Sequence, residues 1–574
     1  MRPPTAAAPH TKQSPDPRPA SNTPPLSLAS IPLPRCLNAP EWVTELKHHP
    51  NRTAVDTAID GIRNGVRLQF TGERNRVQHC NNLPSADEQP EAISSDLAKE
   101  VSKGRMAGPF AHAPVRNLIC SPVGTVPKKD SDEYRRIHHL SWPRGASVNS
   151  YISDMPLEYT SFDHAIRMVR RIGPGARLAK IDVKSAFRCV AVHPSDRHLL
   201  GILWLDNYYV DLCLPFGLKS SPALWEQFAE FAEWIATTNL RIRFVCHYVD
   251  DFLIGGAPDS DECQRSVDAI VQLFGRLGIP INTDKFAAEG APTSVIKFLG
   301  IMINTVTQRA YIDEERVQAI RTALDDWLTR KTCTLTELQS LIGTLAFASK
   351  VVPAGRSFIR RMIDLTKSVK HKRARRRREP VIQITTEFRR DTNWWRAFIS
   401  KWNGVGIWLD DDWTEANALQ LSTDASLTGY GAVCGNDWLH GRWTHDQLAA
   451  AKRNSRESLP YLELLSLVLA ASTFGNRWQG KRVRFHCDCM PVVLALRSGT
   501  SPQPAMMSLI RTLLFIAYTH SFTFSATHIS SVANSSADVL SRVQDPSDVR
   551  RFRESHPTLC PSPTPCSPLP VHNW

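Results

Sequence analysis

The chain contains 574 residues, of which 42% are apolar, and it carries a formal net charge of +13. This length predicts three to five domains of roughly 100–200 residues each, the apolar fraction excludes a wholly disordered protein, and the charge favours a polyanionic partner such as nucleic acid. The 13 cysteines form no repeating framework, which excludes a disulfide scaffold; with no secretion signal or transmembrane segment evident, we expect a cytoplasmic and/or nuclear protein without a membrane partner.

Both ends of the chain are rich in proline. Residues 1–35 contain ten prolines, and the segment HPTLCPSPTPCSPLPVHNW at the other end contains six. Proline lacks a backbone donor and cannot continue a helix or a central strand. We therefore expect a disordered leader over 1–35, an N-terminal extension over 36–90, and a Pro-rich tail over 544–574.

The first chemically informative segment is a predicted strand. Ala176–Val192 alternates in a way that predicts a strand, with Asp182 near its middle and a break of small residues after it. The turn LPFGLKSSP (Leu214–Pro222) then leads into a long helix of aromatic and acidic residues. A strand with one aspartate is common, so this segment alone does not indicate a functional site, and the segments that follow are needed to interpret Asp182.

Two aspartates stand side by side in an apolar stretch. Arg243–Val249 and Phe252–Gly256 predict two short strands, with Asp250 and Asp251 at the turn between them. Adjacent carboxylates repel each other, and each raises the proton affinity of its neighbour. A divalent cation such as Mg²⁺ would compensate for the repulsion and for the desolvation, so we expect a third carboxylate from another strand, and Asp182 supplies it.

The order of these features resembles the palm of the reverse transcriptases. That family has a first-strand Asp, an LP-x-G turn, a Y-x-DD hairpin and an LG hairpin; the chain has Asp182, LPFG, YVDD and KFLGIMI (Lys297–Ile303). Ser121–Ser141 resembles the fingers segment of the family. The resemblance implies that Asp182, Asp250 and Asp251 bind two Mg²⁺ ions, with Mn²⁺ as an alternative, and catalyse nucleotidyl transfer.

The same resemblance implies residues that contact the incoming deoxynucleoside triphosphate, namely Lys128, Arg135, Phe187, Phe216, Gly217 and Lys285. Lys128 and Arg135 would grip the phosphates, since two cations on a hairpin are placed to meet them. Phe187 would exclude a ribose 2′-hydroxyl, Phe216 and Gly217 would form the floor of the pocket, and Lys285 would protonate the leaving pyrophosphate. His139 stands where the family usually has Asp, so the local salt bridge of the family is not expected here.

A predicted thumb and a basic run follow the palm. Thr334 and Glu337 form a capping box, and the helix after it has an apolar stripe of Leu335, Leu338, Ile342 and Leu345. The run KHKRARRRRE (Lys370–Glu379) marks a connection between two globular halves. It is open to three interpretations: a solvated surface segment, a contact with nucleic-acid phosphates, or a nuclear-import signal.

The last third of the chain carries a second set of acids. Asp424 lies on one predicted strand, Asp488 ends another, and Glu463 lies on an apolar helix. His528 and Asp538 follow, ten residues apart. Cys487 and Cys489 flank Asp488, and alternation along a strand predicts that both point away from it and serve packing rather than zinc binding.

Together these residues resemble the RNase H domain that is attached to retroelement reverse transcriptases. The resemblance implies that Asp424, Glu463, Asp488 and Asp538 bind two Mg²⁺ ions that activate water against an RNA phosphodiester. His528 would assist proton transfer or product release. Asn534, between His528 and Asp538, also matches the pattern of the family.

We therefore predict an α+β / α/β multidomain protein: a right-hand polymerase (fingers, palm, thumb) followed by an RNase H-like α/β domain. The predicted segments are fingers and palm over 91–310, thumb over 311–369, basic connection over 370–415 and RNase H-like domain over 416–543. The expected function is RNA-directed DNA polymerase with RNase H activity, and the expected partners are an RNA template, a DNA primer and the RNA–DNA hybrid. The wording of 351–365 and 537–542 resembles retrotransposons that use a tyrosine recombinase (the Dirs type), and next the gypsy type; a separately encoded recombinase or integrase and a Gag-like protein would be further partners.

Two other functions stay open at this point. A decayed, non-enzymatic nucleic-acid-binding relic of a transposon should have lost some of the acids, whereas all of them stand here. An RNA-dependent RNA polymerase shares the palm, but it would lack the second set of acids and would prefer a small polar residue over Phe187.

Overall fold

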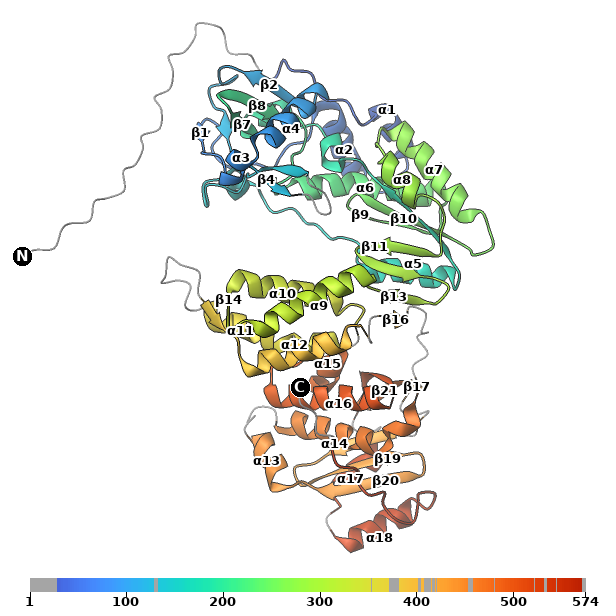
Figure 1. Ribbon diagram of the computed structural model, residues 1–574. Helices are drawn as coiled ribbons and strands as arrows, with labels where there is room; N and C mark the ends of the chain where they lie inside the picture. The colour runs from blue at the N-terminus through green and yellow to red at the C-terminus, as the bar shows by residue number, and fades with distance from the viewer. Residues whose placement is uncertain are drawn as a thin grey trace, which may run out of the picture. The chain divides into compact units, whose positions relative to one another are not determined.

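The computed structural model describes residues 28–127, 133–352, 354–370, 381–400, 404–406, 414–415, 419, 421–452, 458–479, 481–520, 522–530, 534–543 and 545–569. The predicted phosphate contact Lys128 and the basic run from residue 371 lie outside these residues. The chain forms two compact units (Figure 1). The first comprises the chain up to Ile172 together with Arg177–Thr293, and the second comprises Gly173–Ala176 together with the chain from Ser294.

The first half of the first unit is built around a five-stranded sheet and a separate hairpin. Its elements are α1 (Ala39–Glu45), α2 (Arg52–Asn64), β1 (Gln78–His79), α3 (Pro84–Glu88), α4 (Pro90–Ser102), β2 (Met106–Phe110), β3 (Ile119–Cys120), β4 (Val123–Pro127), β5 (Tyr134–His138), η1 (Val148–Tyr151) and α5 (Phe162–Ile172). β4 and β5 pair as an antiparallel hairpin. The sheet, in the order β1-β3-β7-β8-β2, is completed by β7 (Gly201–Trp204) and β8 (Asn207–Asp211).

The second half of the first unit contains a three-stranded antiparallel sheet in the order β6-β10-β9. Its elements are β6 (Arg177–Asp182), η2 (Ala186–Cys189), η3 (Pro194–Leu199), α6 (Ser221–Thr238), β9 (Val245–Tyr248), β10 (Asp251–Gly256), α7 (Glu262–Leu277) and α8 (Thr283–Glu289). β10 is buried at every position after its first residue. Such an apolar run needs cover on both faces, and α6 and α7 contact β9 and β10 accordingly (Figure 1).

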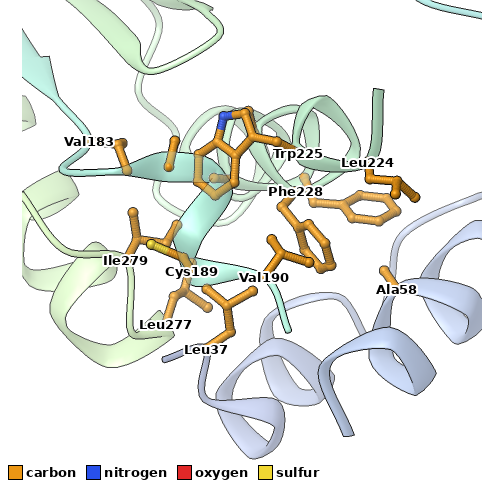
Figure 2. Packing of buried hydrophobic residues seen from close by; sticks show 14 of the residues in the cluster. Leu37, Ala58, Val183, Cys189, Val190, Leu224, Trp225, Phe228, Leu277 and Ile279 are labelled. Carbon is orange, nitrogen blue, oxygen red and sulfur yellow. The ribbon is translucent and has the colours of Figure 1, made fainter. Parts of the chain in front are cut away.

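The core of this unit joins helices and loops that are far apart in the sequence. Figure 2 shows Trp225 and Phe228 of α6 lying over the segment that carries Cys189 and Val190. Leu277, at the end of α7, closes the cluster from another side. The segment that follows Asp182 is therefore held between packed helices rather than left as a surface loop.

The described end of the leader differs from its prediction. A disordered segment is expected through residue 35, yet Leu28 is buried against Leu118, Cys120 and Val210. Arg197 donates to the carbonyl oxygens of Leu28 (2.8 Å) and Ile31 (2.7 Å). The prediction of disorder is wrong for residues 28–35 because two apolar side chains and a buried guanidinium outweigh the prolines around them.

The first part of the second unit is mostly helical. Its elements are β11 (Val295–Phe298), β12 (Ile301–Asn304), β13 (Arg309–Tyr311), α9 (Glu314–Thr329), β14 (Thr332–Thr334), α10 (Leu335–Ala348), η4 (Gly355–Phe358), α11 (Arg360–Lys370), β15 (Val381–Gln383), α12 (Thr386–Phe398) and β16 (Val405–Gly406). Thr334 and Glu337 form the predicted capping box. Ile342 of the predicted stripe is only half-buried, and Leu341 takes its place in the core.

The remainder of the second unit has two three-stranded sheets, β17-β21-β22 and β18-β19-β20, with β18 in contact with β21. Its elements are β17 (Thr414–Glu415), β18 (Leu421–Ala425), β19 (Gly429–Cys434), β20 (Asp437–Arg442), α13 (His445–Lys452), α14 (Ser458–Phe474), η6 (Gly475–Trp478), β21 (Arg482–Cys487), α15 (Met490–Ser498), α16 (Pro504–Thr519), β22 (Thr523–His528), α17 (Ser535–Ser541) and α18 (Pro546–Ser555). Among the described residues one helical stretch, Ser458–Trp478, is long and apolar enough to cross a membrane, but 72% of its apolar window is buried inside the unit, as in a core helix.

The predicted Pro-rich tail is also more structured than expected. It begins with a helix, α18, whose first turn is capped by Asp545. Beyond the helix, Cys560 N–H donates to Asn436 O (2.8 Å) and Thr564 N–H donates to Trp438 O (2.7 Å). As predicted, the described part of 556–569 contains no helix or strand, yet these bonds fix it against the neighbourhood of β20.

Candidate active sites

The acids of the first unit lie at one end of the sheet β6-β10-β9. Asp182 is the last residue of β6, Asp251 is the first residue of β10, and the two are direct partners across these antiparallel strands. Asp250 lies in the turn between β9 and β10, and its carbonyl oxygen accepts from Val183 N–H (2.8 Å). The structure thus brings together the three carboxylates that the sequence predicted, from two strands and one turn.

The turn itself is conformationally demanding. Val249 adopts φ +56°, the left-handed region that β-branched residues rarely enter. Its carbonyl oxygen accepts from the indole N–H of Trp225 (2.7 Å) on α6. A buried tryptophan therefore holds the strained turn that presents Asp250.

Positive charge from the protein only partly balances these acids. Lys285 Nζ lies 2.6 Å from Asp182 Oδ2, and Asn282 Nδ2 donates to Asp182 Oδ1 (3.0 Å). Burial, opposed by Lys180 and reinforced by Asp250 and Asp182, raises the pKa of Asp251 to about 6. Burial and the charge of Asp182 also raise the pKa of Asp250.

The shortage of hydrogen-bond donors and cations is clearest at Asp251 Oδ1. This atom is buried without a hydrogen-bond partner within the described residues, and the nearest cation, Lys180 Nζ, lies 3.9 Å away and is held by Glu289 at 2.6 Å. A buried acceptor with no donor, next to two further carboxylates, suits a divalent cation with oxygen ligands. Asp182, Asp250 and Asp251 are thus a chemically suitable set of ligands for Mg²⁺.

The predicted nucleotide contacts within the described residues lie in the same unit as this cluster. The rings of Phe187 and Phe216 lie 5.2 Å apart, and Phe216 is 48% exposed. Gly217 adopts φ +95°, and a Cβ added there would lie 2.5 Å from His138 O, so only glycine fits. Arg135 is exposed on β5, opposite Val126 of the hairpin.

Several residues at this site escaped sequence reasoning. The predicted site residues did not include Asn282, Lys180 or Glu289. Asn282 is also the N-cap of α8, where its side chain accepts from Lys285 N–H. The pattern NTDK, with a capping residue just before Lys285, is a signal from which Asn282 is recoverable. Lys180 and Glu289 give no such signal, because isolated charges in a sequence usually belong to the surface.

The acids of the second unit come from three kinds of element. Asp424 lies on β18, Glu463 on α14 and Asp538 on α17, while Asp488 directly follows β21. Asn534 Nδ2 donates to Asp424 Oδ1 (3.3 Å) and to Thr423 O (2.9 Å). The structure therefore gathers the predicted acids in one region of this unit, where they influence one another's charge.

The rise in pKa is larger here than in the first unit, and burial is its main cause. Glu463 is only 7% exposed, and burial together with the charges of Asp424 and Asp488 raises its pKa to about 9. Burial, opposed by a hydrogen bond from Ser541, raises the pKa of Asp424 to about 6. A cation placed among these carboxylates would remove both penalties, so this set also fits Mg²⁺.

One prediction about this site is wrong. Alternation predicted that Cys487 points away from Asp488, but the ligand atoms of Glu463, Cys487 and Asp488 all lie within 4.8 Å of one another. The reason is that β21 ends at Cys487, so Asp488 lies beyond the regular strand and alternation no longer applies. Cys489 is the N-cap residue of α15.

His528 stands beside Asp488. It ends β22, is paired with Cys487 across the parallel strands, and its Nε2 lies 3.2 Å from Asp488 O. Its side chain is exposed, which suits a group that exchanges protons with water. Asp538 forms an exposed ion pair with Arg542 (2.6 Å).

Comparisons with known proteins agree with the first cluster. The family described as "Reverse transcriptase (RNA-dependent DNA polymerase)" matches residues 126–303. The Gag-Pol polyprotein of Gibbon ape leukemia virus is 23% identical over 210 residues, which cover 35% of this chain. The matched part of the chain spans only 12% of the length of that polyprotein.

Two solved structures match this chain, each with a TM-score below 0.5. The foamy viral protease-reverse transcriptase dRH in complex with ds DNA is 16% identical, with a TM-score of 0.48, and the match covers 87% of this chain and 83% of that chain. The foamy viral protease-reverse transcriptase in complex with an RNA/DNA hybrid is 15% identical, with a TM-score of 0.48, covering 87% and 64%. The predicted fold class, a polymerase of mixed α and β structure followed by a further α/β domain, is confirmed. Residues 126–303 are a reverse transcriptase domain of the retroelement or retroviral type.

Proposed function

We propose that the chain is an RNA-directed DNA polymerase whose second unit hydrolyses the RNA strand of the RNA–DNA hybrid. The observation that carries the polymerase half is the direct pairing of Asp182 with Asp251, next to Asp250, inside the segment that matches the reverse transcriptase family. These carboxylates are short of protein donors and cations, which is the state expected of groups that share divalent metal.

Asp182, Asp250 and Asp251 would bind two Mg²⁺ ions, which when bound activate the primer 3′-hydroxyl and stabilise the pyrophosphate that leaves. Lys285 has a double function in this proposal: it holds Asp182 in place in the free protein, and its ammonium group supplies a proton at Nζ to the leaving group. Phe187 and Phe216 would line the sugar pocket, with the close backbone approach at Gly217 forming its floor.

Arg135 and Lys128 would bind the triphosphate of the incoming nucleotide. Arg135 has an exposed guanidinium on β5, which is free to meet a polyanion without first losing a buried partner. A planar guanidinium binds phosphate oxygens in pairs, which gives direction as well as charge.

Asp424, Glu463, Asp488 and Asp538 would bind the metal of a ribonuclease H site, whose chemistry is the activation of water against an RNA phosphodiester. Support comes from the raised pKa of Glu463 and from the position of His528 beside Asp488. His528 would carry protons between the reacting groups and water, since its imidazole is exposed and can both donate and accept a proton.

The genomic context is a proposal of its own. The sequences VVPAGRSFIRRMIDL and ADVLSR favour a retrotransposon of the tyrosine-recombinase (Dirs) type, with the gypsy type as the second choice. In that setting a separately encoded recombinase or integrase and a Gag-like protein would be partners, and the templates would be the RNA of the element.

A run-off assay tests both halves at once. The protein is given a labelled RNA template with an annealed DNA primer, together with Mg²⁺ and deoxynucleoside triphosphates. We expect a full-length DNA product and shortening of the RNA strand, and no product when only ribonucleoside triphosphates are supplied. A primer that is never extended would disprove the polymerase, whereas extension with an intact RNA strand would disprove the ribonuclease alone.

A further inference from the structure

A network of buried charges lies behind the sugar pocket. Arg188, Asp211, Glu100 and His138 are all buried in the first unit. Arg188 Nη1 lies 2.8 Å from Asp211 Oδ1, and Arg188 Nε donates to Glu100 Oε2 (2.9 Å). His138 Nδ1 lies 3.2 Å from Asp211 Oδ2. Charges in such a place persist only when each one is paired, so the network fixes the elements that carry them.

The charge states of this network are settled by its own members. Burial acts against the ionised carboxyl of Asp211, but Arg188 and the bond to His138 outweigh it and lower the pKa of Asp211. Burial lowers the pKa of His138, although Asp211 opposes the effect. Asp211 is thus ionised and paired with Arg188, and the lowered pKa of His138 favours its neutral form. Glu100 lies 2.9 Å from Arg188 and also forms longer ion pairs, 3.8 Å each, with Lys103 and Arg105.

Arg188 connects the two rings of the proposed sugar pocket. It directly follows Phe187 in η2. Its Nη1 donates to the carbonyl oxygens of Cys213 (3.1 Å) and Leu214 (3.5 Å), just before Phe216 in the chain. One guanidinium therefore holds the backbone beside each ring, and the ring centroids lie 5.2 Å apart.

The network also reaches the backbone at Gly217. His138 ends β5, the strand that carries Arg135, and its carbonyl oxygen faces Gly217 at a distance that leaves no space for a Cβ. Arg188 Nη2 donates to Arg105 O (3.2 Å), which ties in the chain between α4 and β2. Three segments thus meet at the buried side chain of Arg188, and Asp211 links it to His138 on β5.

From this geometry we propose that Arg188 is a positioning residue for sugar selection: by holding Phe187 against Phe216 it sets the space that admits a deoxyribose and rejects a ribose. The proposal rests on the proposed polymerase function, and it adds a residue that never touches the nucleotide. A lysine at this position keeps the charge, but it has no planar group that donates to Glu100 and to the carbonyl oxygens of Arg105, Cys213 and Leu214 while lying beside Asp211. The ring of Phe187 would then move, and discrimination against the 2′-hydroxyl would weaken.

The test compares Arg188→Lys with wild type in primer extension on an RNA template. For each protein, kcat and KM are measured with a deoxynucleoside triphosphate and with the ribonucleoside triphosphate of the same base. We expect the ratio of the two kcat/KM values to fall by about 10-fold or more. Because the network acts through Phe187, the same substitution in a Phe187→Ala background should change that ratio by less than about twofold. Arg167→Lys, on an exposed face of α5, is the matched control and should leave the ratio unchanged.

A milder variant guards against misfolding. Glu100→Gln keeps an oxygen that accepts from Arg188 Nε and removes one charge, so it should lower the ratio in the same direction, by about threefold. An active wild type whose Arg188→Lys and Glu100→Gln variants keep full selectivity would overturn the role of Arg188 alone. The role of Arg188 would also be overturned if Arg188→Lys lowered the kcat/KM ratio equally in the wild-type and the Phe187→Ala backgrounds. A wild type that extends no primer would instead reject the polymerase function, and this inference with it.

Discussion

The two acid clusters solve the same electrostatic problem in different ways. In the first unit, Lys285 contacts Asp182 at 2.6 Å, and Lys180 stands 3.9 Å from Asp251. In the second unit, within the described residues, no lysine forms an ion pair with Asp424 or Glu463, and the pKa of Glu463 is raised by burial and by its acidic neighbours to about 9. The palm therefore offsets part of its acidic charge with lysines, chiefly Lys285 at Asp182, whereas Glu463 of the second cluster keeps a proton.

This difference predicts two kinds of metal binding. A divalent ion entering the palm must displace an ammonium group, so its affinity depends on how far Lys285 can move. A divalent ion entering the second cluster must displace a proton from Glu463, so its affinity should rise with pH. The predictions below test each side of this comparison, from the largest expected effect to the smallest.

The largest effect should come from Asp250→Asn. The substitution removes a carboxylate that Lys285 does not contact, so no protein cation substitutes for the lost ligand. We expect primer extension to fall by about 10³-fold or more, since metal and its charge stabilisation contribute several kcal/mol. RNA cleavage should remain within about twofold of wild type, because the second set of acids belongs to a separate unit with its own carboxylates.

Asp259→Asn is the matched control for this experiment. Asp259 is exposed in the loop that follows β10, and its loss should leave extension unchanged. Primer extension near the wild-type rate in Asp250→Asn would show that the palm acids are not the catalytic metal ligands.

The next effect concerns the second cluster. Glu463→Gln together with Asp488→Asn removes two of the carboxylates that repel each other, so the site should no longer attract divalent metal. We expect hydrolysis of the RNA strand to fall by about 10²–10³-fold while DNA synthesis continues. Calorimetric titration with Mg²⁺ gives a second measurement, which should lose the heat of binding at this unit.

The exposed pair Asp446→Asn and Glu554→Gln provides a control with the same change in charge. Cleavage that persists in the Glu463→Gln and Asp488→Asn variant, and that stops on chelation, would mean that other residues hold the metal.

A buried histidine beside the palm turn allows a third test. His247 on β9 lies between Glu233 (Nδ1 to Oε2, 2.5 Å) and Glu226 (Nε2 to Oε1, 3.2 Å). Burial lowers the pKa of His247, but hydrogen bonds to these two acids outweigh burial and raise it to about 9. Because the folded pKa lies above the ordinary value of 6.5, the stability from this charge is full below pH 6.5 and is lost as the pH rises through about 9.

His247→Leu should therefore destabilise the first unit by about 3 kcal/mol at pH 6, since it leaves buried carboxylates unpaired. The difference from wild type should shrink at pH 10. Urea unfolding followed by pulse proteolysis, with fragments of the first unit as the readout, measures both values. His112→Leu, at an exposed position, is the control; a loss of equal size at both pH values would show that His247 is neutral in the folded protein.

The sequence predicted the positions of the acids better than it predicted their partners. The strand predicted over 176–192 is shorter in the structure, because β6 ends at Asp182 and a short helix, η2, follows. Asp250 and Asp251 are recoverable because they lie at the turn of a hairpin, where local pattern decides the conformation. Their partners are not, because Lys180 and Glu289 come from elements far apart in the chain and resemble surface charges when read singly. The fold class followed from the resemblance of the motifs to reverse transcriptases and RNase H, whereas long-range ion pairs need the fold.

The errors have the same origin. Alternation fails for Cys487 because the strand ends there, and the helical stripe shifts from Ile342 to Leu341 because neighbouring elements decide which side of α10 is covered. The leader and the tail were judged by their proline content, yet Leu28 in one and Phe552 in the other are buried. Composition predicts the average behaviour of a segment and misses single apolar residues that find a partner.

The smallest effect, and the one that isolates the second cluster, is the pH dependence of stability without metal. Because the pKa of Glu463 rises from 4.5 in its ordinary state to about 9 in the folded unit, the folded unit keeps a proton that the unfolded chain loses above pH 4.5. The stability of this unit should therefore fall as the pH rises from 4.5 to about 9, by at most about 1.4 kcal/mol per pH unit. Asp424, with its pKa raised to about 6, adds to the slope only at lower pH.

Between pH 6.5 and 8.5, Glu463→Gln should remove this slope and make the metal-free unit more stable than wild type, since the amide keeps the neutral form without a charge to desolvate. Glu554→Gln, on the exposed face of α18, should keep the wild-type slope. Urea unfolding of the second unit, measured by pulse proteolysis in chelator, gives the profiles; parallel lines for wild type and Glu463→Gln would mean that Glu463 is ionised in the folded protein and that the second cluster, like the palm, finds its positive charge within the chain.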